Sequence, residues 1–165
     1  MGERLGVYAG SFDPLTNGHL WMIREGAALF DRFVVLVGNN PEKRYTFSPP
    51  ERLRFVTDAV AWMENVDTGF IGNAYLADVA AKMGATHLVR GVRSAADFEY
   101  ERTMRNVNGD RAPAVTTVLL CPPRELCEVS SSMVKGLVGP EGWRGMVERY
   151  VPASTLAALE GMAKR

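Results

Sequence analysis

Short apolar runs of strand length alternate with longer stretches of helical periodicity along the chain. The apolar runs cover residues 5–9, 33–37, 66–71, 87–89 and 115–120. The remaining segments predict helices over residues 20–31, 49–62, 75–83, 96–108, 131–138 and 152–163, and a turn-rich connection over the glycine-rich residues 136–145. Strands that alternate with helices favour right-handed β-α-β crossovers. We therefore expect an α/β fold with a parallel five-stranded sheet and helices on both faces.

The length and the charge balance of the chain indicate which classes of protein it can belong to. The 165 residues suit one domain over residues 1–165, which at this size buries roughly 70% of the surface of the unfolded chain. The 19 basic and 19 acidic side chains balance, so nothing favours a nucleic-acid partner. No apolar stretch reaches membrane-spanning length, and the two cysteines and two histidines show no metal-ligand spacing. We expect a cytoplasmic protein without nucleic-acid or membrane partners and without a metal site of its own.

The segment from Tyr8 to His19 joins the first expected strand to the first expected helix. It reads Tyr-Ala-Gly-Ser-Phe-Asp-Pro-Leu-Thr-Asn-Gly-His. A strand that ends at Gly10, followed by turn residues and a helix start, places backbone amides and His19 at the positive end of the helix, where anions bind. Neither G-x-G-x-x-G nor G-x-x-x-x-G-K-[ST] occurs in the chain. The segment predicts a phosphate-binding loop of another kind.

Two later motifs also follow expected strands. The first is Arg90-Gly91-Val92-Arg93 with Asp97-Phe98-Glu99-Tyr100-Glu101, and the second is Ser130-Ser131-Ser132-Met133-Val134-Lys135. A glycine between two arginines lets the backbone approach a ligand whose phosphate oxygens the guanidinium groups bind. Serines before an apolar helix supply an N-cap and free amides. Because the carboxyl ends of parallel strands meet at one edge, we expect all three motifs to converge there.

In this order the three motifs, including the T-x-G-H pattern that ends at His19, resemble the phosphopantetheine adenylyltransferase family of the nucleotidyltransferase superfamily. The resemblance covers residues 8–135. It implies a single Rossmann-like domain that transfers AMP from ATP to 4′-phosphopantetheine, giving 3′-dephospho-coenzyme A and pyrophosphate in the penultimate step of coenzyme A biosynthesis. It also implies Mg²⁺, a homo-hexamer and feedback inhibition by coenzyme A. Since no Asp-rich site is visible, the Mg²⁺ is expected to sit on the triphosphate with few protein ligands.

The resemblance also implies roles for individual residues. The catalytic residues it implies are His19, which would stabilise the pentacovalent α-phosphate, Lys43 and Arg93. The residues expected to bind ATP are Ser11, Phe12, His19, Gly91, Val92, Arg93, Glu101, Ser130, Ser131 and Ser132. Those expected to bind the acceptor are Ser11, Lys43, Leu76 and Arg90.

Structural roles remain open for the same residues. The alternatives are a helix-capping His19, a turn-bonding Ser11, a solvated Lys43-Arg44 pair, a core-facing Leu76, a plain serine cap, and ion pairs of Arg90 and Arg93 with Asp97 and Glu101. Two other functions also remain. One is a related adenylyl- or cytidylyltransferase, such as one acting on nicotinate mononucleotide. The other is a nucleotide sensor that binds without catalysis.

Overall fold

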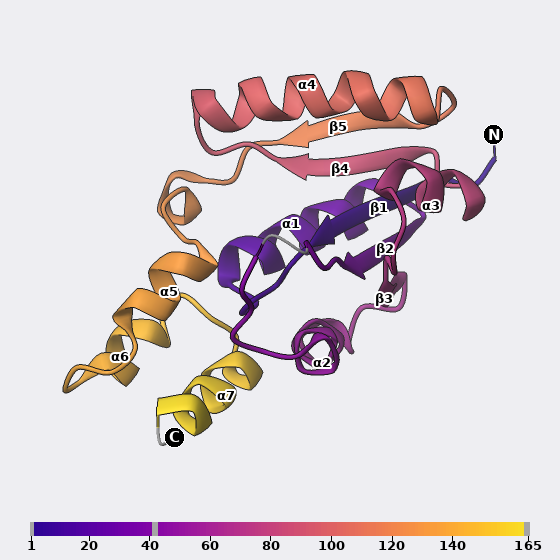
Figure 1. Ribbon diagram of the computed structural model, residues 1–165. Helices are drawn as coiled ribbons and strands as arrows, with labels where there is room; N and C mark the ends of the chain where they lie inside the picture. Colours follow the sequence, from indigo (N-terminus) through magenta and orange to yellow (C-terminus); the bar gives the residue numbers. More distant parts are fainter. Residues whose placement is uncertain (1, 41–42, 164–165) are drawn as a thin grey trace.

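The computed structural model describes residues 2–40 and 43–163 and contains a five-stranded parallel sheet (Figure 1). The strands lie in the order β3-β2-β1-β4-β5. Their bounds are β1 (Leu5–Gly10), β2 (Arg32–Val37), β3 (Val66–Phe70), β4 (His87–Gly91) and β5 (Thr116–Leu120). The predicted α/β fold and all five strands are confirmed, with shifts of one or two residues at their ends.

The six predicted helices are present, and one more was missed. The helices are α1 (Asn17–Leu29), α2 (Pro49–Val60), α3 (Leu76–Lys82), α4 (Ala95–Arg111), α5 (Ser131–Leu137), α6 (Trp143–Val147) and α7 (Ala153–Ala163), with a short 3₁₀ turn η1 (Arg124–Leu126). The predicted connection over residues 136–145 was partly wrong, because Gly136 lies in α5 and Trp143 begins α6. None of the helices in the described ranges is long and apolar enough to cross a membrane.

The two faces of the sheet carry two separate cores. On β2, Phe33, Val35 and Val37 belong to one core, whereas Val34 and Leu36 belong to the other, as the alternation of side chains along a strand requires. Buried residues of α1, α2 and α5 to α7 complete the first core, and those of α3 complete the second. Figure 1 shows α4 alongside β5 at one side of the molecule, with α2 and α7 at the other. The predicted placement of helices on both faces is confirmed.

Two glycines, Gly26 in α1 and Gly6 in β1, let helix α1 lie close to the sheet. A Cβ atom at Gly26 would lie 2.1 Å from the ring of Phe33, closer than any side chain tolerates. A Cβ atom at Gly6 would lie 2.6 Å from the ring of Phe30. The stacked rings of Phe30 and Phe33 therefore fill the space between helix and sheet that these two glycines leave.

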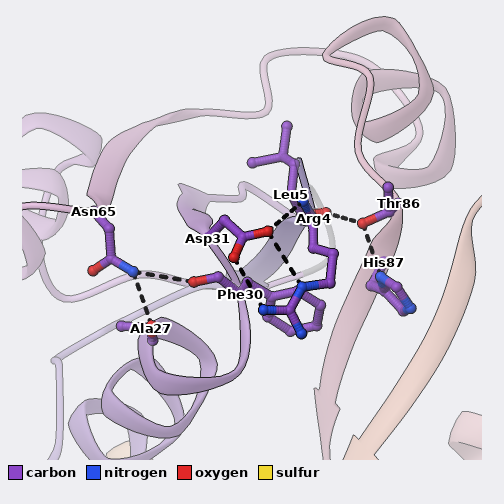
Figure 2. A network of polar contacts seen from close by, with 8 residues as sticks. All are labelled: Arg4, Leu5, Ala27, Phe30, Asp31, Asn65, Thr86 and His87. Atoms are coloured by element: carbon purple, nitrogen blue, oxygen red, sulfur yellow. Dashed lines mark hydrogen bonds and ion pairs between the residues drawn. The ribbon is translucent and has the colours of Figure 1, made fainter. Parts of the chain in front are cut away.

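Polar contacts fasten the amino-terminal end of the sheet (Figure 2). Arg4 binds Asp31 through its backbone N–H at 2.8 Å and through its guanidinium. Asn65 donates to two carbonyls at the end of α1, and the hydroxyl of Thr86 donates to the carbonyl of Leu5 at 3.0 Å. These bonds connect β1, α1 and the segments that lead into β3 and β4. The three sequence motifs lie at the opposite, carboxyl end of the sheet.

The strand order reverses direction at β1. The chain moves from β1 to β2 and β3 on one side, then returns to place β4 and β5 on the other. In open parallel sheets, ligands bind beyond the carboxyl ends of the strands at such a reversal. The three sequence motifs follow β1, β4 and β5, so they reach this crevice as predicted.

Candidate active site

Two adjoining cavities open at the carboxyl ends of the strands. The first, here the α1 cavity, has a volume of about 400 Å³ and is lined by Tyr8, Ala9, Gly10, Gly18, His19, Met22, Lys43, Arg90, Gly91, Arg93, Asp97, Tyr100, Glu101, Pro122, Leu126, Val129, Ser130 and Ser131. The second, here the α3 cavity, has a volume of about 480 Å³ and is lined by Ala9, Gly10, Ser11, Gly38, Asn39, Asn40, Lys43, Ile71, Gly72, Ala74, Tyr75, Leu76, Arg90, Tyr100, Met104, Val107, Asn108 and Arg111. The two cavities share Lys43 and Arg90, so two cations stand where they meet.

The buried carboxylate of Asp13 holds the loop that follows β1 in place. Asp13 accepts hydrogen bonds from the backbone N–H groups of Thr46 and Phe47 and from the Lys135 ammonium, which lies 2.8 Å from Oδ2. Burial opposes ionisation of Asp13, but these donors outweigh it and keep the pKa of the carboxyl below its ordinary 3.8. Phe12 is also buried and has a positive φ of 49°. Asp13 therefore holds the turn after β1 in place, and Lys135 is its partner.

Replacing Asp13 with asparagine is expected to lower the free energy of unfolding by about 2–4 kcal/mol at neutral pH, because the partly buried Lys135 loses its partner and an amide cannot satisfy the same donors. A carboxyl whose pKa is depressed on folding stabilises the native state above its unfolded pKa and loses that contribution as the pH falls. Urea unfolding at neutral pH and near pH 3 should therefore show a smaller pH dependence for Asp13→Asn than for the wild type. Equal pH dependence would contradict this account.

His19 lies in the first turn of α1 and faces the α1 cavity. Thr16 caps the helix, and its backbone N–H donates to Nδ1 of His19 at 3.1 Å. Because Nδ1 accepts that hydrogen bond, the neutral imidazole carries its own proton on Nε2. Burial, together with the charge of Arg93, lowers the pKa of His19 to about 4. The capping role left open by the sequence is therefore present, and the same ring also lines the cavity.

His19 is expected to stay neutral between about pH 8 and pH 5. Its pKa falls from 6.5 to about 4 on folding, so the native state disfavours the imidazolium and loses stability as the pH drops through that range. Proton NMR of the imidazole Cε1–H signals measures this directly. The chain has two histidines, and His19→Gln identifies the His19 signal by its disappearance. A His19 signal that titrates near pH 6.5 would contradict the stated effect of burial and of Arg93 on this imidazole.

Both arginines of the second motif are paired with acids in the following helix. Arg90 makes a two-pronged contact with the buried carboxylate of Glu101, at 2.8 and 2.7 Å, and also donates to the carbonyl of Ala9. Arg93 contacts Asp97 at 3.1 Å through its Nε. The ion pairs left open by the sequence are present, yet all four side chains line the α1 cavity. The pairs thus fix the two guanidinium groups at the cavity wall.

The other expected ligand-binding residues divide between the cavities. Ser11 and Leu76 line the α3 cavity, and Gly91 lines the α1 cavity. The exposed Lys43 lines both, and two residues of its predicted loop, Pro41 and Glu42, lie outside the described residues.

The serine run also divides. Ser130 and Ser131 line the α1 cavity, while the hydroxyl of Ser130 accepts the N–H of Met133 and that of Ser131 donates to the carbonyl of Pro14. Ser132 is exposed and lines neither of these cavities. The plain cap left open by the sequence is therefore present at Ser130.

Phe12 and Val92 also stand outside both cavity walls. The buried Phe12 ring packs edge-on against Tyr8 and His19, with its centroid 5.7 Å and 5.2 Å from theirs. The backbone N–H of Val92 donates to the carbonyl of Leu120, which extends the sheet. These two residues support the cavity walls by packing and by pairing.

Several cavity residues were not predicted. Met22, Pro122, Leu126 and Val129 give the α1 cavity an apolar wall. Tyr8 also lines it, and burial raises the pKa of the Tyr8 phenol to about 12 against the opposing charges of Arg90 and Arg93. Tyr8 and Tyr100 stand inside two of the quoted motifs, so position within a motif is the signal that would have found them. Met22 carried no such signal, because a methionine in an amphipathic helix suits a core.

Comparison with known proteins identifies the chain's relatives. The family model described as cytidylyltransferase-like matches residues 7–137. Phosphopantetheine adenylyltransferase of Chromobacterium violaceum is 52% identical over 146 residues, covering 88% of this chain and 89% of the relative. The enzyme of the same name from Latilactobacillus sakei is 35% identical over 164 residues, covering 99% of this chain and 98% of the relative.

A solved structure has the same fold at much lower identity. Nicotinic acid mononucleotide adenylyltransferase of Plasmodium falciparum superposes with a TM-score of 0.73, covers 98% of this chain and 96% of its own, and is 12% identical. This likeness concerns the fold alone. The sequence identity to the two phosphopantetheine adenylyltransferases, in contrast, extends over most of each sequence. The chain belongs to the phosphopantetheine adenylyltransferase family and carries a cytidylyltransferase-like domain.

Proposed function

We propose that this protein transfers AMP from ATP to 4′-phosphopantetheine, releasing pyrophosphate and forming 3′-dephospho-coenzyme A. The observation that carries the proposal is the shared wall of the two cavities. One cavity suits a nucleotide, the other suits a long uncharged arm, and Lys43 and Arg90 stand at their junction. Two phosphate-bearing molecules that each occupy one cavity would meet at these cations.

The α1 cavity is proposed to hold ATP. Its apolar wall of Met22, Leu126 and Val129 suits a purine ring, and its polar wall of His19 and Arg93 suits phosphate oxygens. The neutral imidazole presents an N–H donor rather than a positive charge, which fits a group that stabilises charge as it develops on the α-phosphate.

The α3 cavity is proposed to hold the acceptor. Leu76, Met104 and Val107 supply apolar surface along its length, and Asn108 supplies an amide that suits the peptide-like groups of a pantetheine arm. Ser11 lines the same cavity as the shared cations and is proposed to contact the acceptor phosphate with them. This arrangement supports a phosphorylated, elongated and otherwise uncharged acceptor.

The proposed reaction requires the protein to position two phosphate groups and to neutralise their negative charge. An acceptor phosphate is mostly dianionic near neutral pH, so it attacks the α-phosphorus without a general base. A bond forms between an acceptor phosphate oxygen and the α-phosphorus, and the bond from that phosphorus to the bridging oxygen of the β-phosphate breaks. Lys43 and Arg90 would hold the attacking phosphate, while His19 and Arg93 would neutralise charge on the transferred group.

Magnesium is proposed to enter as the ATP complex. Within residues 2–40 and 43–163, no three His, Cys, Asp or Glu side chains gather in a way that could hold a metal ion. The ion would therefore bind the triphosphate oxygens, with few protein ligands, and it arrives and leaves with them. Titration of turnover against free EDTA at fixed ATP tests this requirement.

Three further properties are proposed from the family resemblance alone. They are assembly into a homo-hexamer, feedback inhibition by coenzyme A, and a cytoplasmic location. A coenzyme A molecule carries the pantetheine arm and an adenosine phosphate, so it would compete for both cavities. Inhibition that is competitive with 4′-phosphopantetheine would support this, and analytical ultracentrifugation measures the assembly.

Nucleotide choice tests the proposal against the related cytidylyltransferases. With 4′-phosphopantetheine as acceptor, ATP should support formation of a dephospho-coenzyme A product, identified by its mass, and CTP should not. A clear preference for CTP would contradict the proposed reaction. A purified wild-type protein that binds ATP but forms no product with this acceptor would favour the sensor.

A further inference from the structure

Arg52 of α2 is a fully buried cation with neutral partners. Its Nη1 donates to the carbonyls of Ser11 at 2.7 Å and Gly38 at 2.9 Å, and its Nη2 donates to the side-chain oxygen of Asn39 at 2.9 Å. Its guanidinium lies 4.0 Å from the centre of the Tyr45 ring. The side chain has 0% exposure and its Nε has no hydrogen-bond partner among the described residues. Three neutral oxygens and one aromatic ring thus surround a full positive charge.

A buried charge of this kind is costly. Arginine side chains that leave water are normally paired with a carboxylate, and removal from water is strongly unfavourable without one. The ion pairs formed by residues 2–40 and 43–163 do not include Arg52. Among the described residues Arg52 therefore has no carboxylate partner, and it lies against the loops that follow β1 and β2.

The position of this cation relates it to the α3 cavity. Ser11, Gly38 and Asn39, the three residues that accept its hydrogen bonds, all line that cavity, whereas Arg52 does not. The carbonyls of Ser11 and Gly38 are turned toward the guanidinium. Arg52 therefore lies behind the layer of the cavity wall that Ser11, Gly38 and Asn39 form.

We infer that Arg52 is a positioning residue for the acceptor phosphate: it fixes the Ser11 turn against the end of β2, and the bound phosphate serves as its counter-ion across that layer. The inference rests on the proposed function, which places a phosphate in the α3 cavity. An anion that arrives in a site of low dielectric gains from a buried charge even without touching it. Three cations, two of them in the wall and one behind it, would then act on the same phosphate.

The test compares two acceptor analogues in binding rather than in turnover. Calorimetry measures the affinity of wild-type protein, Arg52→Gln and Arg52→Lys for 4′-phosphopantetheine and for pantetheine, which lacks the phosphate. Arg54→Gln is the matched control, because it removes the same charge from an exposed position on the same helix. The ratio of the two affinities isolates the contribution of the phosphate from that of the arm.

The expected result is a loss of affinity only for the ligand that carries the phosphate. Arg52→Gln should lower the affinity for 4′-phosphopantetheine by about tenfold, as one buried charge at a distance of several ångströms allows, and leave pantetheine unchanged. Arg52→Lys and Arg54→Gln should stay within about threefold of the wild type. Equal loss for both analogues would show a merely structural role and overturn the inference, as would an unchanged ratio in Arg52→Gln.

If Arg52→Gln does not fold, the pH dependence of the phosphate preference of Arg52→Lys tests the same inference. A buried lysine gives up its proton more readily than an arginine, so the phosphate preference of Arg52→Lys should fall at alkaline pH relative to that of the wild type. Tyr45, the titratable group stacked on this side chain, is common to both proteins. Parallel pH profiles would overturn the inference. If the wild type itself prefers neither analogue, the proposed function fails instead.

Discussion

Replacing His19 with glutamine is expected to lower the turnover number by about 10²- to 10³-fold while leaving the fold intact. The imidazole does two things at once: its Nδ1 accepts the backbone N–H of Thr16, and its ring lines the α1 cavity, where the neutral tautomer offers an Nε2–H donor. Glutamine at this third helical position retains an oxygen that can accept the Thr16 N–H. It withdraws the imidazole donor from the cavity. Steady-state kinetics and thermal unfolding of the same preparation measure both effects.

His19→Ala is the companion variant that separates capping from catalysis. It should lose turnover to the same extent and, in addition, lose about 1 kcal/mol of stability because the Thr16 N–H is left without its partner. A glutamine variant that keeps more than a tenth of the wild-type turnover would show that the cavity does not depend on the imidazole. Equal stabilities for the two variants would contradict the capping role.

Replacing Arg90 with methionine is expected to have the largest effect on stability and to abolish measurable acceptor binding. Glu101 is buried and both its oxygens accept from Arg90, so the variant leaves a buried carboxylate without its partner. Breaking such a pair costs about 3–5 kcal/mol. Arg90 also stands at the junction of the cavities, where the acceptor phosphate is proposed to bind. Urea unfolding and calorimetric titration with 4′-phosphopantetheine check the two parts.

The double variant Arg90→Met with Glu101→Leu separates these parts. Removal of both charges should recover most of the lost stability, because two apolar side chains can replace a buried ion pair at little cost. It should not recover binding or turnover, because the cation at the junction is still absent. Recovery of turnover together with stability would reduce Arg90 to a structural residue.

The sheet and its helices could be predicted because local sequence signals agree with the fold. The strands β1 and β2 are apolar over almost all of their buried length, as strands covered on both faces require, and Pro49 marks the start of α2 as its position after Ser48 predicts. The start of α1 was predicted three residues late, because the helix begins directly after its Thr16 cap rather than at the first apolar residue of the stripe. The short α6 was missed because the glycines around it predict turns.

The candidate site could be predicted at the level of motifs and only partly at the level of contacts. The predicted convergence is present, since His19, Arg90 and Arg93 meet in one cavity wall. The role of Arg52 could not be predicted, because its three acceptors lie 41, 14 and 13 residues away and only the packing of α2 on the sheet brings them together. A charged residue in an amphipathic helix is ordinarily exposed.

The partner of Asp13 was equally hidden. Lys135 lies 122 residues further along the chain, within the serine motif. In the structure its ammonium contacts Asp13 in the loop after β1. Pairs of this kind depend on tertiary packing, which no local pattern encodes.

Pyrophosphate release by the purified protein distinguishes the proposed reaction from its alternatives in one assay. The assay supplies ATP and Mg²⁺ with 4′-phosphopantetheine, pantetheine, nicotinate mononucleotide or no acceptor. Release is expected with 4′-phosphopantetheine alone, since the shared cations require a phosphate and the α3 cavity requires an arm. Release with nicotinate mononucleotide in its place would contradict the proposed acceptor, and no release with any acceptor would contradict the proposed catalysis.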